Sequence, residues 1–281
     1  MTAITDEGKP LYDAAIIGAG PGGLSTAIYL GRYRRRVIVF DRGKSRASFV
    51  PVVHNFLGFP DGVSGKELIE KGTRQAEKYG VEFRREEVRG VSGKADSFVL
   101  DTEGGTYRAR RLVFATGIMD HHLDVLNFYD YAGKSIFYCP DCDGYEVSGK
   151  QVVAVGSGNG VAALALVLLT FTDRITVCTN GEPAGMDDKF SGRLRYNRIE
   201  VVEEKITDIR GSEGQIQAFV LAGGKELPCQ GAFVHLGARV HSGLAKDLGV
   251  ELLRNEHIKT DRKQQTNLEG VWALGDVSAS S

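Results

Sequence analysis

Two cysteines separated by two residues are the groups best suited to chemistry in this chain, in the segment Cys139-Pro140-Asp141-Cys142-Asp143. The spacing suits a dithiol that closes to a disulfide at the first turn of a helix, where the helix dipole favours a thiolate. A thiolate is the form that attacks a substrate disulfide. Asp143 stands beside the second cysteine, where a carboxyl group can give or take a proton. The segment therefore predicts thiol–disulfide exchange.

A structural zinc site is the alternative interpretation of the cysteine pair. Such sites need four ligands in most cases, and the sequence has no second Cys-x-x-Cys and no His-x-x-x-His. His121 and His122 are adjacent, unlike ligands placed four residues apart on a helix. We therefore predict no metal site. Cys178 and Cys229 stand in apolar segments and are expected to be buried.

A glycine-rich turn follows the first predicted strand, with the residues Gly18, Gly20, Pro21, Gly22 and Gly23. In this pattern Gly18 makes the tight turn, Gly20 allows close approach of a pyrophosphate, and Gly23 allows helix and strand to pack closely. The helix start offers N–H groups and a positive dipole end to phosphates. Asp41 ends the next strand, about 20 residues on, where an acid accepts from ribose hydroxyls. The segment predicts a dinucleotide site.

A second turn repeats the pattern with Gly156, Gly158, Asn159 and Gly160. The strand that follows ends at residues 178–181, without Arg or Lys for a 2′-phosphate and without an acid for a ribose. Arg193 and Arg195 stand further along the chain. The second turn therefore predicts weak binding of NADPH or none.

The order of the elements predicts an α/β fold. Residues 14–41 and 151–178 both read strand, glycine turn, helix, strand, which indicates two doubly wound, Rossmann-like domains. The β-prone stretches 82–114 and 200–221 are interpreted as small antiparallel insertions, one in each domain.

The domains are expected to be interleaved along the chain. Residues 1–118 and 242–281 form the predicted domain of the first glycine turn, and residues 119–241 form the predicted domain of the cysteine pair and the second glycine turn. The linkers 117–120 and 237–242 are the predicted hinges.

Composition excludes several classes of protein. The 281 residues include 35 basic and 36 acidic side chains, so no basic excess points to nucleic acid or to an anionic membrane. No apolar run approaches the ~20 residues of a membrane span, and residues 1–10 lack the pattern of a signal peptide. Four cysteines are too few for a disulfide scaffold. These features favour a cytoplasmic protein.

The order of these motifs resembles that of low-molecular-weight thioredoxin reductases, which are FAD-dependent pyridine-nucleotide disulfide oxidoreductases. The resemblance covers nearly the whole chain, and three further segments carry it: His54-Asn55-Phe56-Leu57-Gly58-Phe59-Pro60, Ala115-Thr116-Gly117 and Gly275-Asp276. It implies FAD bound at the first glycine turn, with contributions from Asp41, Asn55, Thr116, Gly117, Gly275 and Asp276.

The resemblance also implies roles for the cysteine segment. Cys142 faces the flavin, Cys139 attacks the substrate disulfide, and Asp143 is the general acid and base. Thioredoxin or a similar disulfide protein is the implied substrate, and a homodimer is the implied assembly. Family members without a working nicotinamide site take electrons from reduced ferredoxin or another flavin, so the altered second turn leaves NADPH open as the donor.

The expected function is a flavin-dependent disulfide reductase. Two alternatives stay open at this point. One is an oxidase of small dithiols with oxygen as acceptor. The other is a non-enzymatic flavoprotein whose domains act as a redox-responsive binding module.

Overall fold

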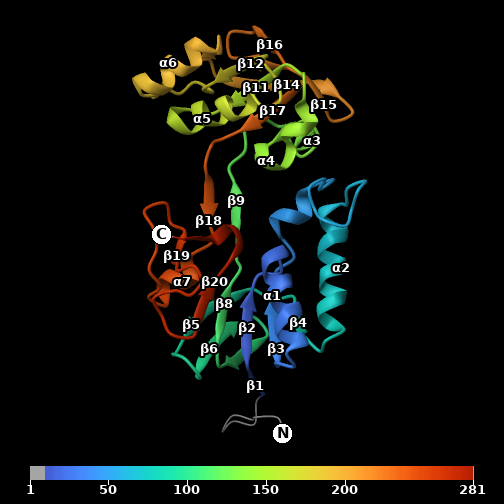
Figure 1. The fold of residues 1–281 in the computed structure, drawn as a ribbon, viewed down its shortest axis with the longest axis vertical. Coiled ribbons are helices and arrows are strands. Elements are labelled where there is room, and N and C mark those ends of the chain that lie inside the picture. The colour runs from blue at the N-terminus through green and yellow to red at the C-terminus, as the bar shows by residue number, and fades with distance from the viewer. Residues whose placement is uncertain (1–9, 281) are drawn as a thin grey trace. The chain divides into compact units, whose positions relative to one another are not determined.

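The computed structural model describes residues 10–280, which divide into two compact units (Figure 1). Unit 1 comprises the described residues up to Val50, then Val63–Met119, then those from Arg239 onward. Unit 2 comprises Pro51–Gly62 and Asp120–Ala238. Residues 51–62 therefore group with unit 2, whereas the sequence assigned them to the predicted domain of the first glycine turn. The interpretation of residues 1–9 lies outside the described residues.

A five-stranded parallel sheet forms the centre of unit 1. Its order is β20 (Val271–Ala273), β8 (Leu112–Phe114), β2 (Ala14–Ile17), β3 (Val37–Phe40) and β4 (Glu82–Arg84). Every residue of β2 is buried, and the side chains alternate between two cores: Ala15 and Ile17 pack in one, Ile16 in the other. Both faces are thus covered, as is usual for parallel sheets.

The two long helices of unit 1 begin differently. They are α1 (Pro21–Arg32) and α2 (Gly65–Glu77). Ser64 caps α2 by accepting from the Glu67 N–H, an arrangement typical of a Ser-x-x-Glu sequence. In α1 the N-cap is Gly20, which has no side chain to bond, and Pro21 occupies the first helical position. The first turn of α1 is therefore left without a side-chain cap.

Smaller elements complete unit 1. They are the four-stranded sheet β1 (Leu11–Tyr12), β7 (Gly105–Ala109), β6 (Phe98–Thr102), β5 (Val88–Ser92); the pair β19 (Ile258–Thr260) and β21 (Ser278–Ser280); helix α7 (Gly243–Asp247); and the 3-10 turns η1 (Arg46–Phe49) and η3 (Gly275–Val277).

Unit 2 repeats the plan around a second five-stranded parallel sheet. Its order is β10 (Ile136–Phe137), β17 (Gly231–Val234), β11 (Val152–Val155), β12 (Ile175–Cys178) and β13 (Glu200–Val202). The antiparallel sheet is β14 (Ile206–Ser212), β15 (Gln215–Leu221) and β16 (Glu226–Pro228). The helices are α3 (Phe128–Tyr131), α4 (Pro140–Asp143), the 3-10 turn η2 (Gly144–Val147), α5 (Gly158–Leu168) and α6 (Asp188–Tyr196).

Both antiparallel insertions begin later than predicted. β4 and β13 were expected to open them, but β4 pairs in parallel with β3, and β13 pairs in parallel with β12. Each is a three-residue edge strand without a fully buried residue. Short, half-exposed strands carry no pattern that identifies the strand with which they pair. Alternation of apolar and polar residues indicates which side chains face the core, but it does not indicate the neighbouring strand.

Two short strands carry the chain between the units. They are β9 (Ile118–Asp120) and β18 (Ala238–Val240), which pair with each other. The His241 N–H donates to the Gly117 carbonyl at 3.1 Å, and the His121 N–H donates to the Gly237 carbonyl at 3.0 Å. Gly117 and Gly237 both have positive φ, a conformation that glycine adopts readily. The predicted hinge segments contain these strands.

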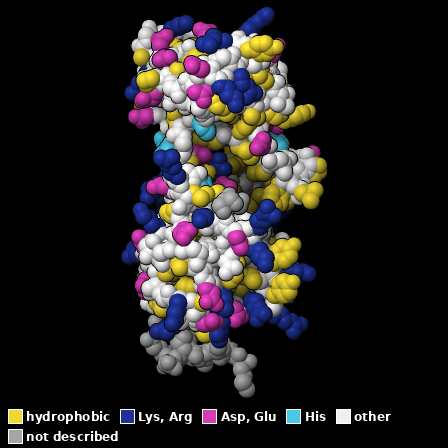
Figure 2. Space-filling view, turned by 60° about the vertical axis from the view of Figure 1, so that its left-hand side comes forward, with side chains coloured by type: hydrophobic (Ala, Val, Ile, Leu, Met, Phe, Trp, Pro, Cys, Tyr) yellow, Lys and Arg dark blue, Asp and Glu magenta, His cyan; other side chains and the backbone are white. Residues whose placement is uncertain are grey.

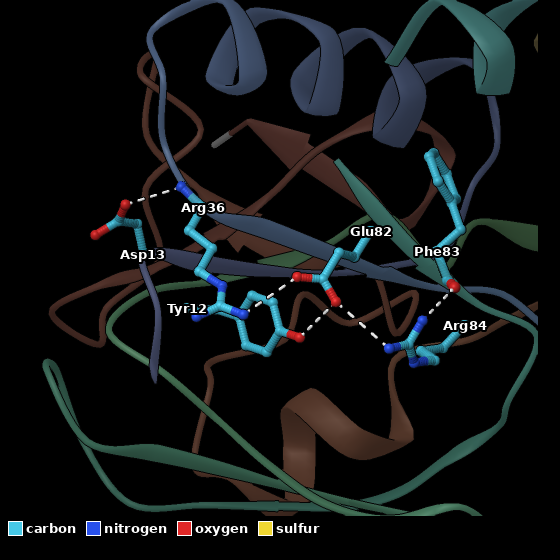
Figure 3. Close-up of polar contacts among 6 residues, drawn as sticks. All are labelled: Tyr12, Asp13, Arg36, Glu82, Phe83 and Arg84. Carbon is cyan, nitrogen blue, oxygen red and sulfur yellow. Dashed lines mark hydrogen bonds and ion pairs between the residues drawn. The ribbon is translucent and has the colours of Figure 1, made fainter. Parts of the chain in front are cut away.

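A charged network closes the amino edge of the unit 1 sheet (Figure 3). The Glu82 carboxylate accepts from the Tyr12 hydroxyl at 2.8 Å and from Arg36 and Arg84 at 3.4 Å. Burial, together with the hydrogen bond to Glu82, raises the pKa of Tyr12 to about 12. The glycine turn lies at the opposite, carboxyl edge of this sheet, so we interpret the network as structural.

Within residues 10–280, no helix has the length and apolar composition needed to cross a bilayer. Figure 2 shows basic and acidic side chains interspersed over the face that it presents. This mixing agrees with the near-neutral net charge of −1.

Candidate functional site

The first glycine turn connects β2 to α1, and two of its glycines are required by the backbone itself. A Cβ atom on Gly18 would lie 2.2 Å from the Ala115 carbonyl oxygen, and Gly18 has a φ of +107°. A Cβ atom on Gly23 would lie 2.0 Å from the Gly18 carbonyl oxygen. Gly20 differs, since its Cβ atom would meet only the Ser45 hydroxyl, at 3.6 Å. No contact among residues 10–280 requires a glycine at position 20.

The start of α1 presents hydrogen-bond donors. Among the described residues, no acceptor outside the helix binds the N–H groups of Gly22 and Gly23. Asp41 lies at the end of β3 and accepts from the Ala19 N–H at 2.6 Å and from the Gly43 N–H at 2.5 Å. Each carboxylate oxygen has a second lone pair for a further donor. The turn thus combines donors suited to a phosphate with an acceptor suited to a hydroxyl.

Three more candidate residues lie near this turn in unit 1. A Cβ atom on Gly22 would lie 3.7 Å from the Gly275 Cα, which places η3 beside the start of α1. Asp276 pairs with Arg46 at 3.3 Å. The Thr116 hydroxyl donates to the His241 carbonyl at 2.6 Å, so it ties the strand end before Gly117 to the returning linker.

Sequence reasoning missed Ser45 and Arg46 as neighbours of the turn. Ser45 lies next to Gly20, and Arg46 contacts Asp276. Both follow Asp41 by a few residues, in η1 and just before it. That proximity to a predicted ribose acceptor is the one signal that the sequence offered.

Asn55 is the one predicted FAD residue that groups with unit 2. Its neighbour His54 has Nε2 3.9 Å from the Glu146 carboxylate, in the η2 turn that directly follows α4. Segment 51–62 therefore contacts the turn next to the cysteine pair. Asn55 belongs to unit 2, whereas Gly18 belongs to unit 1.

The cysteine pair forms a disulfide, as predicted. Cys139 is the N-cap of α4, and its Cα lies 5.2 Å from that of Cys142. The N–H groups of Cys142 and Asp143 donate to the Cys139 carbonyl at 3.2 and 3.0 Å, which closes the turn around both sulfurs. Cys142 is exposed and Cys139 is partly buried. Among the described residues, no three His, Cys, Asp or Glu side chains are grouped to hold a metal ion.

The other two cysteines are buried thiols, as expected. Cys178 ends β12, and Cys229 lies between β16 and β17. Burial raises the pKa of the Cys229 thiol to about 12 and raises that of Cys178 as well. Since the thiolate is the reactive form, these two thiols are unsuited to exchange at neutral pH.

The second glycine turn connects β11 to α5 and contains Gly156, Gly158, Asn159 and Gly160. The neighbouring β12 ends at Cys178, and the Asn180 side chain that follows accepts from the Ile206 N–H at 2.9 Å. Asn180 thus takes part in the structure of unit 2, at the place where a ribose or a 2′-phosphate is recognised in dinucleotide sites.

Comparison with known proteins gives consistent results. Residues 12–281 match the family described as pyridine nucleotide-disulphide oxidoreductase. The chain is 31% identical to the thioredoxin reductase of Treponema pallidum, over 96% of this chain and 90% of the relative. It is 30% identical to the 34.2 kDa protein in the rubredoxin operon of Clostridium pasteurianum, over 94% and 88%. The crystal structure of thioredoxin reductase from Streptococcus pyogenes superposes with a TM-score of 0.90 at 25% identity, over 96% and 91%.

The family match spans residues 12–281, from the first glycine turn to the late Gly-Asp, and the alignment with the Treponema pallidum relative covers 96% of the chain. The two Rossmann-like units and the disulfide agree with it. The chain belongs to the low-molecular-weight thioredoxin-reductase-like family of pyridine nucleotide-disulphide oxidoreductases and is an FAD oxidoreductase of that kind.

Proposed function

We propose that the protein is a flavin-dependent disulfide reductase that passes electrons from FAD through Cys139 and Cys142 to a protein disulfide, with thioredoxin or a similar protein as substrate. The observation that supports this most directly is the Cys139–Cys142 disulfide on an accessible turn, in the same chain as a dinucleotide-type glycine turn. The thioredoxin reductases among the relatives support the choice of substrate.

The residues of unit 1 fit FAD. The N–H groups at the start of α1 would hold the pyrophosphate, the absence of a side chain at Gly20 would let it approach the backbone, and Asp41 would accept from the ribose. Gly275 and Asp276 lie at the same helix start. When bound and reduced, FAD supplies two electrons to a disulfide.

The cysteines then act by exchange. The Cys139 thiolate attacks one sulfur of the substrate disulfide and forms a mixed disulfide, and the other substrate sulfur leaves and takes a proton from Asp143. Cys142 then attacks the Cys139 sulfur, which restores the internal disulfide and releases the second substrate thiol. Two electrons and two protons thus pass to the substrate in each cycle.

A donor other than NADPH is part of the proposal, and reduced ferredoxin or another flavin is the class expected. The end of β12 supports this, because residues 178–181 offer no basic group for a 2′-phosphate. One relative is named for its place in a rubredoxin operon. That name concerns the relative, but it agrees with a setting of protein electron carriers.

Single cysteine variants test the exchange step. Cys142→Ser leaves Cys139 able to attack and unable to be released, so we expect it to accumulate a mixed disulfide with oxidised thioredoxin, visible by non-reducing electrophoresis. Cys139→Ser is the matched control and should accumulate none. A mixed disulfide that forms only in Cys139→Ser would reverse the roles, and none in either variant would refute the proposed substrate.

Anaerobic visible spectroscopy tests the electron path. We expect a flavin spectrum that dithiothreitol bleaches in the wild type and not in Cys142→Ser. Bleaching by stoichiometric NADPH would refute the proposed donor class. Absence of a flavin spectrum after FAD is added back would refute the function itself.

A further inference from the structure

The second glycine turn is occupied by the chain's own loop. The Gly158 N–H, the first of helix α5, donates to the Ala184 carbonyl at 2.7 Å. The next residue, Asn159, pairs in both directions with Asp187: its side-chain NH₂ donates to the carboxylate at 2.9 Å, and its carbonyl oxygen accepts from the Asp187 N–H at 3.0 Å. Asp187 also caps α6 by accepting from the Phe190 N–H. Figure 1 shows α6 lying next to α5.

A histidine also lies against the second glycine turn. His235 directly follows β17, the neighbour of β11 in the sheet. A Cβ atom on Gly160 would lie 2.4 Å from His235 Nε2, so the ring fills the space that a side chain at position 160 would take. The order in which strands are added to the sheet reverses between β11 and β17. From β11 the chain continues to β12 on one side, and β17 is added later on the other side. Dinucleotides bind in the crevice at such a point.

The two glycine turns of this chain therefore differ in a specific way. At the first turn, among the described residues, the N–H group of Gly20, which is the residue that corresponds to Gly158, has no acceptor. At the second turn, a carbonyl takes the first N–H of the helix and a carboxylate binds the next side chain. A carbonyl oxygen competes with a phosphate oxygen for the same donor, and a carboxylate repels the phosphate.

We infer that Asp187 and His235 are specificity-determining residues that exclude a nicotinamide dinucleotide from the second turn. Asp187 anchors the loop 182–187 over the start of α5, and His235 fills the crevice above Gly160. The inference deepens the proposed function, on which it rests, because it gives a physical reason why electrons do not enter from NADPH. Binding alone tests it, so it can fail while the dithiol–flavin circuit holds.

The test is calorimetric titration of the flavin-loaded protein with NADP⁺ and with NAD⁺, which bind without reducing the flavin. We expect no saturable heat for the wild type up to about 1 mM, in the range of very weak affinity. The double variant His235→Ala/Asp187→Asn should bind at least about 10-fold more tightly, the size expected when a competing charged contact is lost. Asparagine keeps the cap of α6.

Asp188→Asn is the matched control for charge. It removes the same charge from the next residue, in the first turn of α6, and should leave nucleotide affinity at the wild-type level. Retained flavin and far-UV circular dichroism establish that each variant is folded. Micromolar binding of NADP⁺ or NAD⁺ by the wild type would overturn the inference, and so would a folded double variant that binds no better than the wild type.

Discussion

Replacing Gly20 by alanine separates cofactor binding from folding. Gly20 has φ −66° and ψ 175°, which alanine adopts without strain. Among the described residues, the new Cβ would meet only the Ser45 hydroxyl, at 3.6 Å. Loss of a glycine N-cap costs up to about 1 kcal/mol, and the stiffer unfolded chain returns about 0.4–1 kcal/mol. The apoprotein should therefore keep its free energy of unfolding within about 1 kcal/mol.

The same methyl group should weaken FAD binding. If the pyrophosphate approaches the backbone at Gly20, the Cβ displaces it from at least one charge-assisted hydrogen bond, worth about 1.5–3 kcal/mol. That corresponds to an increase in Kd of about 10- to 150-fold. The assay is titration of flavin-free protein with FAD, followed by quenching of flavin fluorescence, beside urea unfolding of the same apoprotein.

Gly23→Ala is the contrasting variant. Its Cβ would lie 2.0 Å from a backbone oxygen, so the strand and helix must separate. We expect a loss of more than about 3 kcal/mol in stability, at the severe end for single substitutions. Wild-type affinity for FAD in Gly20→Ala would show that the pyrophosphate does not lie over Gly20. Wild-type stability in Gly23→Ala would contradict the close approach of helix and strand.

Three further outcomes are expected. Tyr12→Phe removes the hydrogen bond to Glu82 and should cost about 1–2 kcal/mol in urea unfolding. The pKa of Tyr12 is raised from 10.0 to about 12 in the folded state, so the contribution of its hydroxyl to the free energy of unfolding is present below about pH 10 and is lost as the pH rises towards 12. The wild type and Tyr12→Phe should therefore converge in stability over that range. Ser135→Ala removes the hydroxyl that donates to the buried Gly214 carbonyl and accepts from the buried Ile216 N–H, so it should lower the free energy of unfolding by about 1–3 kcal/mol. Replacing the exposed Ser148 by alanine should not lower it by this amount. After reduction, iodoacetamide at pH 8 should label two thiols in the folded protein and four in urea, since Cys178 and Cys229 are buried with raised pKa values; labelling of either in the folded state would contradict their burial.

Much of the fold could be predicted because its signals are local. The glycine turns and the buried apolar strands each depend on neighbours in sequence, and both appear where expected. The edge strands β4 and β13 could not be placed, because their partners are distant in sequence and their side chains are half-exposed.

The candidate site shows the same division. The cysteine pair was predicted from its spacing, and it forms a disulfide. Asp41 was also predicted from spacing, and its carboxylate accepts from the Ala19 N–H of the glycine turn. Segment 51–62 groups with unit 2, and contacts such as His54 with Glu146 join residues far apart in the chain, so no local pattern indicates this grouping. His235 and Asp187 carry no motif, and only the three-dimensional proximity of Gly160 and Asn159 reveals what they do.

The insertion of unit 2 into unit 1 has a consequence for biosynthesis. A nascent chain that has reached Ala238 contains all of unit 2, including the cysteine turn, but lacks β20 and the Gly275-Asp276 element. Since domains generally fold as units during synthesis, we expect the disulfide-bearing unit to mature first. The sheet of unit 1 gains β20 beside β8 only after residues 271–273 have left the ribosome. Flavin capture is then a late event, and a chain truncated just before β20 would carry the redox pair without its source of electrons.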